Sequence, residues 1–448
     1  MGTHKNLPRW IAAAILACGF VAALAVNWPG HMEYDGTLQL LEGRTGLYSN
    51  WHPPVMSWLL GVGDAIAPGF ALFVVFDTAM AFGALAAILF LVKRPGWFAV
   101  LGAAIAVALP QLFLFQAIVW KDVLFADACV LGFVCLAQAA FRWERERTRF
   151  VWLGASAIFL VLAALTRQNG FLVLPVAAVA LAVIAPRRLL YGAGFFAACL
   201  VLMLGTNALL QLRATAALGA TEQFEDLELY DLAGMMKRDP SITLSILDRD
   251  APGMAKIMHA KGAALYTPAS HDPLSDESGM GPFIAPSIDA VKRQWRATVA
   301  AHPLLYLAVR LDDFSYVFLS RHHEACMAYA VGVDGPKWAM TRLGLATRYD
   351  DRDNALDDEY AAPLLATPLF SHPFFAAIDI VCFVLLLRRR RPADLAMAGM
   401  IASVALYTLS YFAIAIACEY RYLFAIDLSA IAAALYLVAD FRAKERSA

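Results

Sequence analysis

The first polar segment of the chain reads Asn27-Trp-Pro-Gly-His-Met-Glu33-Tyr34-Asp35-Gly-Thr-Leu-Gln39 and closes with Asn50-Trp51-His52-Pro53-Pro54. It follows a single apolar run, residues 10–26, that is long enough to cross a membrane. Two carboxylates, Glu33 and Asp35, therefore come just after a predicted span. A carboxylate at a membrane surface is a candidate general base, because substrates can reach it from lipid and from water. The alternative interpretation is an ordinary solvated loop between helices.

The composition indicates a polytopic membrane protein. The 448 residues are 60 % hydrophobic and only 16 % charged, whereas an average soluble domain has about 25 % charged residues. The formal net charge of −1 gives no reason to expect a nucleic-acid partner. Residues 10–26 are predicted to be a retained first span, because Asn27-Trp28-Pro29 offers no small-residue cleavage site for a signal peptidase.

About ten apolar segments are predicted as transmembrane helices, which places the chain in the all-α class. The predicted spans are residues 10–26, 70–92, 97–119, 123–141, 150–165, 171–185, 189–210, 373–387, 393–418 and 423–439. Residues 55–67 are apolar but too short to cross, and they contain Asp64, so an interfacial or re-entrant helix is expected there.

This pattern predicts three parts. Residues 1–210 form an N-terminal membrane module of about seven spans, in which the first outer loop, 27–54, carries the chemistry. Residues 211–371 are polar and too long for a loop, so they predict a small extracytoplasmic domain. An amphipathic helical region is expected at 287–320, interrupted by Pro303. Residues 372–448 return to the membrane.

The basic residues predict the orientation. If residues 55–67 do not cross, one side of the membrane receives Lys5, Arg9, Lys93, Arg94, Arg142, Arg145, Arg147, Arg149, Arg187, Arg188 and the arginines of 388–391 and 442–446. By the positive-inside rule that side is cytoplasmic. The chain is thus predicted to be an integral multi-pass protein of the cytoplasmic (inner) membrane, with both termini in the cytoplasm and the 27–54 loop outside.

A second set of charges lies at the opposite ends of the spans. Its cations are Arg44, Lys121, Arg167 and Arg421, and its carboxylates include Asp35, Asp122 and Glu419. Cations placed against the orientation bias can bind an anion such as a lipid phosphate, which an arginine contacts with two hydrogen bonds. Structural ion pairs or contacts with lipid headgroups are the alternative.

The order of these motifs resembles the GT-C superfamily of membrane glycosyltransferases, in particular protein O-mannosyltransferases and the lipid A aminoarabinose transferase. Glu33-Tyr34-Asp35 stands at the acidic motif of the family, and His52-Pro53-Pro54 matches its His-Pro-Pro element. Three further turns are similar to outer turns of the family: Trp120-Lys121-Asp122, Thr166-Arg167-Gln168-Asn169-Gly170 and Glu419-Tyr420-Arg421-Tyr422. The resemblance covers residues 10–210 and returns near the C-terminus, but it does not extend to residues 211–371.

The resemblance implies transfer of a sugar from a polyprenyl-phosphate donor to an acceptor hydroxyl, with inversion. Asp35 is the favoured base, although Glu33 remains open because Tyr34 separates two carboxylates that are adjacent in many members. Arg167, Lys121 and Arg421 would bind the donor phosphate. The expected substrate-binding residues are His52, Gln39, Asp122 and Tyr420. The acceptor can be a glycan, a lipid or a protein, and no metal or other cofactor is expected.

Two other clusters are not predicted to be sites. Arg321-His322-His323-Glu324-Ala325-Cys326 contains metal-ligand types, but adjacent histidines point apart. The segment Asp350 to Glu359 lacks the spacing of a calcium loop and is expected to be a solvated surface. A Cys326–Cys418 disulfide across the outer face is an open possibility.

Two other functions compete with an enzyme. A transporter or flippase of lipid-linked sugars would explain the spans and the outer cations, and Asp77, Asp127, Asp379 and Asp427 within spans agree with it. A non-enzymatic assembly or anchoring subunit would tolerate neutral replacement of Asp35.

Overall fold

The computed structural model of the chain describes residues 6–49, 51–212, 220–319 and 323–441. Every regular element within these ranges is a helix, and the only β pairing there consists of isolated bridges. The prediction of an all-α polytopic membrane protein is therefore confirmed.

Within the described residues, seven helices are long and apolar enough to cross a membrane. They are α1 (Leu7–Asn27), α4 (Ala71–Ile88), α7 (Lys121–Phe141), α8 (Glu146–Thr166), α10 (Arg188–Gln211), α21 (Pro392–Ile414), and η8 (Tyr420–Leu423) continued by α22 (Phe424–Asp440). Helix α7 lies at the centre of the bundle. In its most apolar stretch of 18 residues, 94 % of the residues are buried, so α7 contacts protein rather than lipid on nearly all sides.

The other predicted spans are also helical. The third is broken, because α5 (Phe98–Ala108) and the pair α6 (Pro110–Phe113) and η2 (Phe115–Ala117) meet at 69°. Pro110 begins the second half and has no N–H to continue α5. The remaining two spans are η3 (Gly170–Leu172) with α9 (Val173–Ile184), and α20 (His372–Arg389). If the broken pair is counted as one span, eight of the about ten predicted spans are long and apolar enough to cross a membrane.

The short segment after the first outer loop forms α3 (Pro54–Ile66), whose 13 residues are too few to span the hydrocarbon. Helix α3 packs against α2 (Tyr34–Thr45), α4, α8 and α10. Gly43 and Gly61 allow the closest contact, because a Cβ on either glycine would lie less than 3 Å from the backbone of the other helix.

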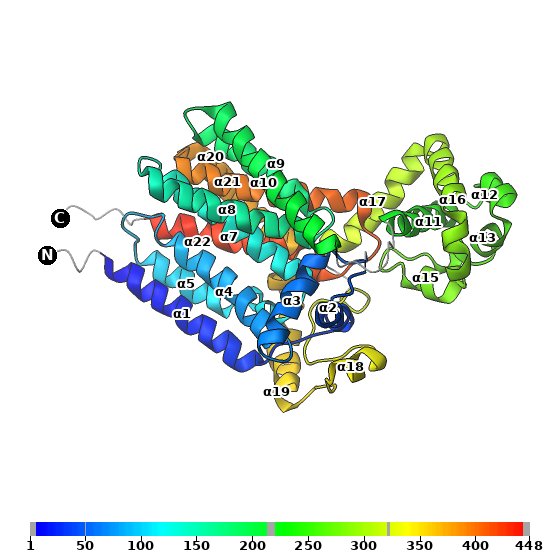
Figure 1. Cartoon of the computed structure of the whole chain (residues 1–448), viewed down its shortest axis with the longest axis horizontal. Coiled ribbons are helices and arrows are strands. Elements are labelled where there is room, and N and C mark those ends of the chain that lie inside the picture. The colour runs from blue at the N-terminus through cyan, green and yellow to red at the C-terminus, as the bar shows by residue number, and fades with distance from the viewer. Residues whose placement is uncertain (1–5, 50, 213–219, 320–322, 442–448) are drawn as a thin grey trace.

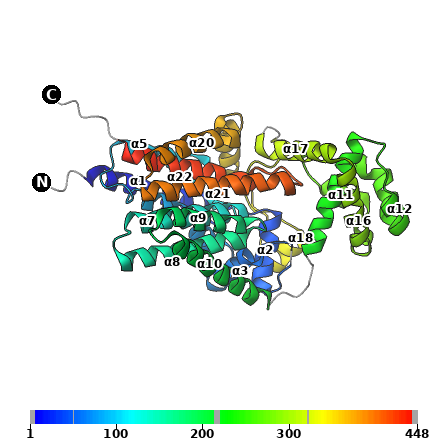
Figure 2. The same ribbon diagram turned by 90° about the horizontal axis from the view of Figure 1, so that it is seen from above.

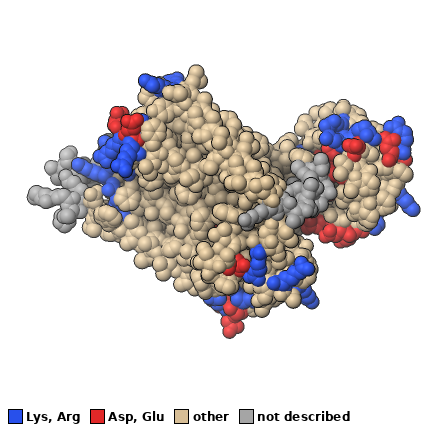
Figure 3. Space-filling view, in the orientation of Figure 1, with Lys and Arg blue, Asp and Glu red and all other residues tan. Residues whose placement is uncertain are grey.

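The start of α1 and the end of α22 lie at one end of the bundle, and a helical lobe lies beyond the other end (Figures 1 and 2). The lobe contains α11 (Ala220–Arg238), α12 (Ser245–Asp250), α13 (Pro252–Ile257), η4 (Met258–Gly262), α14 (Ala263–Leu265), α15 (Asp272–Ser278), α16 (Gly281–Ala301) and α17 (Pro303–Leu319). It has its own apolar core, which includes Val309 in the first half of α17, whereas Val317 in the second half of α17 belongs to the core of the bundle. Figure 3 shows charged side chains at the two ends and an uncharged flank between them, as a membrane-spanning bundle requires.

The polar stretch predicted as one domain occupies two places. Residues 220–319 form the lobe, with the expected break at Pro303 between α16 and α17. Residues 323–370 return to the bundle and carry α18 (Lys337–Leu343), α19 (Asp351–Asn354), η5 (Ala355–Ala361), η6 (Ala362–Leu364) and η7 (Pro368–Phe370). Helix α18 packs on α2.

The prediction of a solvated acidic surface is wrong for Asp353. Its carboxylate is fully buried and bonds Arg348, with an Nε–Oδ2 distance of 2.8 Å. Arg348 also donates to the carbonyl of Gly30 at 2.8 Å. Asp353 therefore helps to hold the first outer loop, a long-range contact that an acidic run does not reveal.

The Cys326–Cys418 disulfide forms, with a Cα–Cα distance of 5.1 Å. It joins the segment after α17 to the residue just before Glu419. The N–H of Tyr420 donates to the carbonyl of Met327 at 3.0 Å on the same stretch. The disulfide thus fixes the start of the predicted Glu419–Tyr422 motif.

We expect the double variant Cys326→Ser/Cys418→Ser to lose about 2–5 kcal/mol of stability, because the cross-link that closes a long loop in the unfolded chain is gone. Thermal unfolding in detergent measures the loss. Cys18→Ser, which removes an exposed free thiol, is the control and should unfold like the wild type. Equal unfolding temperatures of the double variant and the control would show that the disulfide contributes nothing.

Candidate active site

Glu33 begins helix α2 and is fixed by three donors. As the N-cap residue, it accepts the N–H of Asp35 on Oε2 at 3.0 Å. Its Oε1 accepts the indole N–H of Trp120 at 3.1 Å and a guanidinium N–H of Arg421 at 2.9 Å. An N-cap carboxylate also faces the positive end of the helix dipole. Both oxygens of Glu33 are thus engaged with the protein itself.

Arg421 lies at the centre of the site. Its guanidinium bonds Asp35 Oδ2 at 2.7 Å as well as Glu33, and its Nε pairs with Glu419. A further carboxylate, Asp122, lies 3.8 Å from Nε. The Arg421 guanidinium also lies over the ring of Trp120, 5.2 Å from its centroid. With 4 % of its side chain exposed, Arg421 is a buried cation that needs all these partners.

Asp35 differs from Glu33 in having one oxygen only loosely engaged. Oδ2 bonds Arg421, but Oδ1 faces His52 Nε2 at 3.6 Å, which is longer than a hydrogen bond. Burial raises the pKa of Asp35, and the contacts with Arg421, His52 and Lys121 oppose this, so that the pKa lies well below its usual range. Asp35 is therefore ionised, and Oδ1 is the oxygen that can accept a proton.

His52 connects Asp35 to Lys121. The Lys121 ammonium lies 2.6 Å from His52 Nδ1 and must be the donor, because it has no acceptor. Burial and the charge of Lys121 lower the pKa of His52 to about 4, so the ring is neutral near pH 7. Its single proton is then on Nε2, pointing at Asp35.

Arg167 provides a second buried guanidinium beside the first. It pairs with Asp122 Oδ1 at 3.2 Å and donates to the hydroxyl of Tyr411 at 2.5 Å. Tyr422 lies against its face, 5.3 Å from the ring centroid. Arg167 Nε has no hydrogen-bond partner although it is buried. Asp122 thus lies between Arg167 and Arg421 and holds the two cations near each other.

A cavity of about 260 Å³ reaches Arg167 from the side of the bundle. It lies among α8, η3 and α10, and its lining includes Pro53, Gln168, Leu204 and Asn207. Leu204 is 60 % exposed on the flank, where lipid would lie. An amphiphile in this cavity would place a polar group at Arg167 and an apolar chain along α10.

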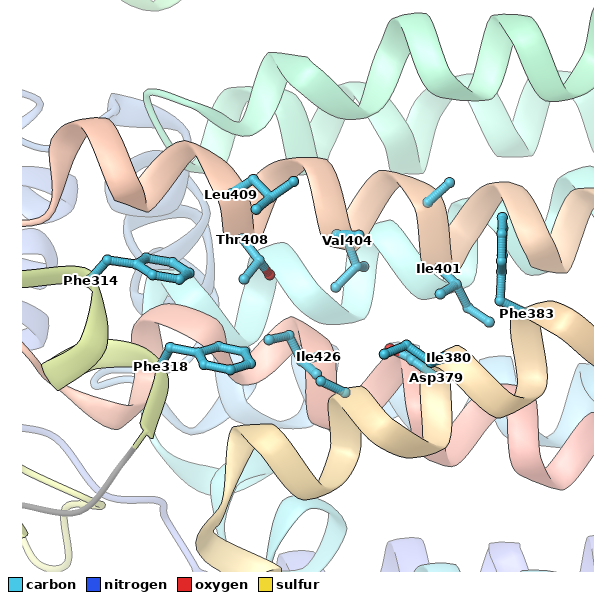
Figure 4. A pocket seen from close by; sticks show the side chains of 13 residues that line it. Phe314, Phe318, Asp379, Ile380, Phe383, Ile401, Val404, Thr408, Leu409 and Ile426 are labelled. Carbon is cyan, nitrogen blue, oxygen red and sulfur yellow. The ribbon is translucent and has the colours of Figure 1, made fainter. Parts of the chain in front are cut away.

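A larger groove of about 400 Å³ lies between α20 and α21 (Figure 4). Phe314 and Phe318 of α17 line one end, and its lining is apolar except for Asp379 and Thr408. No cation is among the lining residues, so this groove can hold a hydrocarbon chain but is not suited to a phosphate.

The predicted residues meet in one place with few exceptions. The structure brings together Glu33, Asp35, His52, Lys121, Asp122, Arg167 and Arg421. Gln39 is buried on α2 one turn after Asp35. Tyr420 is also buried, and its hydroxyl donates to Asp427 rather than pointing at Asp35.

Arg44 was grouped with Lys121, Arg167 and Arg421, and for Arg44 the structure shows the alternative interpretation, a structural ion pair. It forms a two-point ion pair with Asp64 of α3, at 2.6 and 2.8 Å, and donates to the carbonyl of Leu343. Arg44 lies more than two helical turns beyond Asp35 on α2. The Arg44 side chain stabilises the contact between α2 and α3.

Four contributors were not predicted as site residues. Trp120, Glu419 and Tyr422 stand inside motifs that the sequence singled out. Tyr411 stands within an apolar run, 244 residues from Arg167, and no local pattern could have indicated it.

No group of three or more His, Cys, Asp or Glu side chains in the described ranges is arranged to hold a metal ion. In the Arg321–Cys326 cluster, Arg321 and His322 lie outside the described residues.

Comparison with known proteins gives structural neighbours only. No family model and no curated protein sequence matches the chain. Two solved structures of an oligosaccharyltransferase from the archaeon Archaeoglobus fulgidus each align with 95 % of this chain. One, AglB in complex with an inhibitory peptide and a dolichol-phosphate, has 14 % identity and a TM-score of 0.40. The other, tethered to an acceptor peptide with the NVT sequon, has 12 % identity and a TM-score of 0.41. The chain spans about half the length of each, 50 % and 49 %.

We expect Arg421→Gln to cost about 3–5 kcal/mol of stability, because it leaves the carboxylates around Arg421 without their shared cation. Denaturation in detergent measures this. Arg44→Gln is the matched control, since Arg44 also makes a two-point carboxylate pair but is 31 % exposed; its loss should stay below about 1 kcal/mol. Similar losses in both variants would contradict a special role for Arg421 in holding the site.

Proposed function

We propose that this protein is a GT-C-type membrane glycosyltransferase that transfers a sugar from a polyprenyl-phosphate donor to an acceptor hydroxyl at the outer membrane surface, with inversion. The observation that carries the proposal is one cluster of charges at the end of the bundle from which the lobe extends. In it Asp35 is ionised, pairs with Arg421 and has one oxygen open. Lys121 joins the cluster through His52, and Arg167 joins it through Asp122. The resemblance of the same motifs to GT-C enzymes supports it.

Asp35 is the catalytic base in this mechanism. Glu33 is a poor candidate because both of its oxygens already accept protein hydrogen bonds. Asp35 Oδ1 accepts the proton of the acceptor hydroxyl while the hydroxyl oxygen attacks the anomeric carbon. His52 Nε2–H, facing the same oxygen, orients the carboxylate and the incoming hydroxyl. A base of low pKa contributes at the lower end of the usual 10²–10⁴-fold range.

The cations stabilise the leaving group. The bond between the anomeric carbon and the phosphate oxygen breaks as the new glycosidic bond forms, and the electron pair leaves with the polyprenyl phosphate. A single displacement inverts the anomeric carbon. Arg167 Nε has no protein partner, so a phosphate oxygen can take that position. Arg421 and Lys121 are near enough to share the developing negative charge through preorganised contacts.

The cavity beside Arg167 supplies the route for the donor. A lipid that slides along α10 meets Leu204 with its chain and Arg167 with its phosphate. This geometry fits a donor that never leaves the membrane. The lobe of residues 220–319 lies beyond the same end of the bundle (Figure 1), and its position suits recognition of the acceptor.

The Cys326–Cys418 disulfide supports an outward-facing site. Disulfides form and persist in oxidising compartments and are rare in the cytosol, and this one adjoins Glu419. The basic residues at the end with both termini agree with a cytoplasmic location of that end. The catalytic loop would then face the periplasm or the cell exterior.

We expect Asp35→Asn to lower kcat about 10²-fold with little change in donor affinity, because the amide cannot accept the proton. Glu33→Gln should fold less well but retain more activity. The measurement uses purified, folded protein, polyprenyl-phosphate sugars as donors and membrane extract as acceptor, and it follows sugar release. Equal turnover by wild type and Asp35→Asn would remove Asp35 from the mechanism.

The same preparation tests the transporter alternative. If wild-type protein in vesicles moves a lipid-linked sugar between leaflets while its bond to phosphate stays intact, the glycosyltransferase proposal fails.

We expect Arg167→Gln to raise KM for the donor about 10–100-fold, since a charged hydrogen bond to phosphate is worth about 1.5–3 kcal/mol. Arg149→Gln is the control, because Arg149 is in the first turn of α8, at the opposite end of the helix that Arg167 follows. An unchanged KM in folded Arg167→Gln would place the donor phosphate elsewhere.

A further inference from the structure

A buried polar cluster lies directly beneath the site and is used by no step above. Its members are His372 at the start of α20, Asp427 of α22, Gln111 of α6 and Tyr420 of η8. All four are at most 2 % exposed. Polar groups buried inside a membrane bundle are costly unless they are paired. The hydrogen bonds among these four residues therefore require a structural or functional explanation.

Tyr420 is held at four points by this cluster and its surroundings. Its hydroxyl donates to Asp427 Oδ2 at 2.5 Å, and its carbonyl accepts from His372 Nε2 at 2.9 Å. The His372 ring stacks on the Tyr420 ring with centroids 4.0 Å apart. The backbone N–H of Tyr420 donates to the carbonyl of Met327. Both the backbone and the side chain of Tyr420 are thereby fixed, and the next residue is Arg421.

The hydrogen bonds also determine how many protons the cluster holds. The carbonyl of Tyr420 can only accept, so His372 Nε2 carries a hydrogen. His372 Nδ1 lies 2.9 Å from Asp427 Oδ1, and two acceptors cannot make such a contact. One more proton must lie between them, as an imidazolium–carboxylate pair or as a neutral histidine with a carboxylic acid. Gln111 Nε2 and the Tyr420 hydroxyl both donate to Asp427 Oδ2, which favours the carboxylate.

We infer that His372 and Asp427 are positioning residues for the transferase reaction: together they lock Tyr420 and thereby aim the Arg421 guanidinium at Glu33 and Asp35. Two residues separate this pair from the substrate, so neither touches the reacting atoms. The inference rests on the proposed function for its kinetic consequence, but the placement of Arg421 can be measured without any activity.

The test uses full-length protein in detergent and four variants. His372→Phe keeps a ring for stacking but loses both hydrogen bonds, and Asp427→Ala removes the acceptor of Tyr420 and His372. Asp427→Asn is the conservative variant, because its amide can donate to Nδ1 of a neutral His372 while its oxygen still accepts from Tyr420. Ser429→Ala is the control, since Ser429 is equally buried on α22 and bonds Asp379 instead.

The first readout is labelling of Arg421 by phenylglyoxal, followed by mass spectrometry. Arg421 is buried in the wild type and should react slowly. We expect His372→Phe and Asp427→Ala to react about tenfold faster or more, because local opening now exposes the guanidinium. Asp427→Asn and Ser429→Ala should stay as protected as the wild type.

The second readout is the pH profile of kcat/KM. Asp35 is faced by Glu33, His52, Lys121, Glu419 and Arg421, and the charge of Arg421 lowers the pKa of Asp35. When Arg421 moves away, the pKa of Asp35 rises. Since the base must be ionised, the acid limb of the profile should move to higher pH. A loss of packing alone would leave this limb in place.

The kinetic expectation is a fall of about 100-fold in kcat for His372→Phe and Asp427→Ala, the usual effect of a misplaced catalytic group. Asp427→Asn should remain within about threefold of the wild type, because neutral hydrogen bonds replace the charged one between the same residues.

The inference is overturned if folded His372→Phe and Asp427→Ala keep Arg421 protected and the acid limb unmoved. If neither variant folds, Tyr420→Phe replaces them. It removes only the hydroxyl and keeps the stack, so unchanged protection of Arg421 there would equally overturn the inference. If the labelling pattern appears as expected but the wild type transfers no sugar, the positioning role stands and the proposed function fails.

Discussion

The Arg421 guanidinium is the interaction on which the rest of the site depends. It bonds Glu33 and Asp35, residues that precede it by 388 and 386 positions, and so joins the 27–54 loop to the start of the last membrane helix. A buried cation is tolerated only where carboxylates surround it. Four acidic side chains, Glu33, Asp35, Asp122 and Glu419, lie within 4 Å of it. The position of the proposed base is therefore set from across the whole chain.

The segment that carries Arg421 is itself held from several sides. Arg310 of the lobe donates to the carbonyls of Ala413 and Ala415 at the end of α21, and it is paired with Asp231 at 2.9 Å. The disulfide fixes Cys418, and the His372–Asp427 pair fixes Tyr420. These restraints come from the lobe, from the 323–370 segment and from the bundle core. Together they make the site rigid where a preorganised electrostatic environment is most valuable.

The two cavities divide the surroundings of the site by chemistry. The one beside Arg167 offers a cation and an apolar flank, which suits a phospholipid-like donor. The groove between α20 and α21 is lined by hydrocarbon with no cation (Figure 4). Helix α21 separates them, because Tyr411 contacts Arg167 on one face while Thr408 and Leu409 line the groove on another. The proposed transfer from a lipid-borne donor to an acceptor needs such separate surfaces.

The sequence by itself determined the helical class and the helical segments, and it indicated that most residues of the candidate site share one end of the bundle. Long apolar runs and local motifs carry this information, because hydrocarbon thickness and backbone hydrogen bonding leave a membrane segment few alternatives. Glu33, Asp35, His52, Lys121, Asp122, Arg167 and Arg421 were all identified from short patterns. Only the tertiary structure decided how they pair: that Arg44 belongs to Asp64, that Tyr411 supports Arg167, and that His372 and Asp427 underlie Tyr420. Those contacts join residues that are as many as 244 positions apart in the sequence. The partner of a buried charge depends on how the helices pack, and no local sequence pattern contains that information.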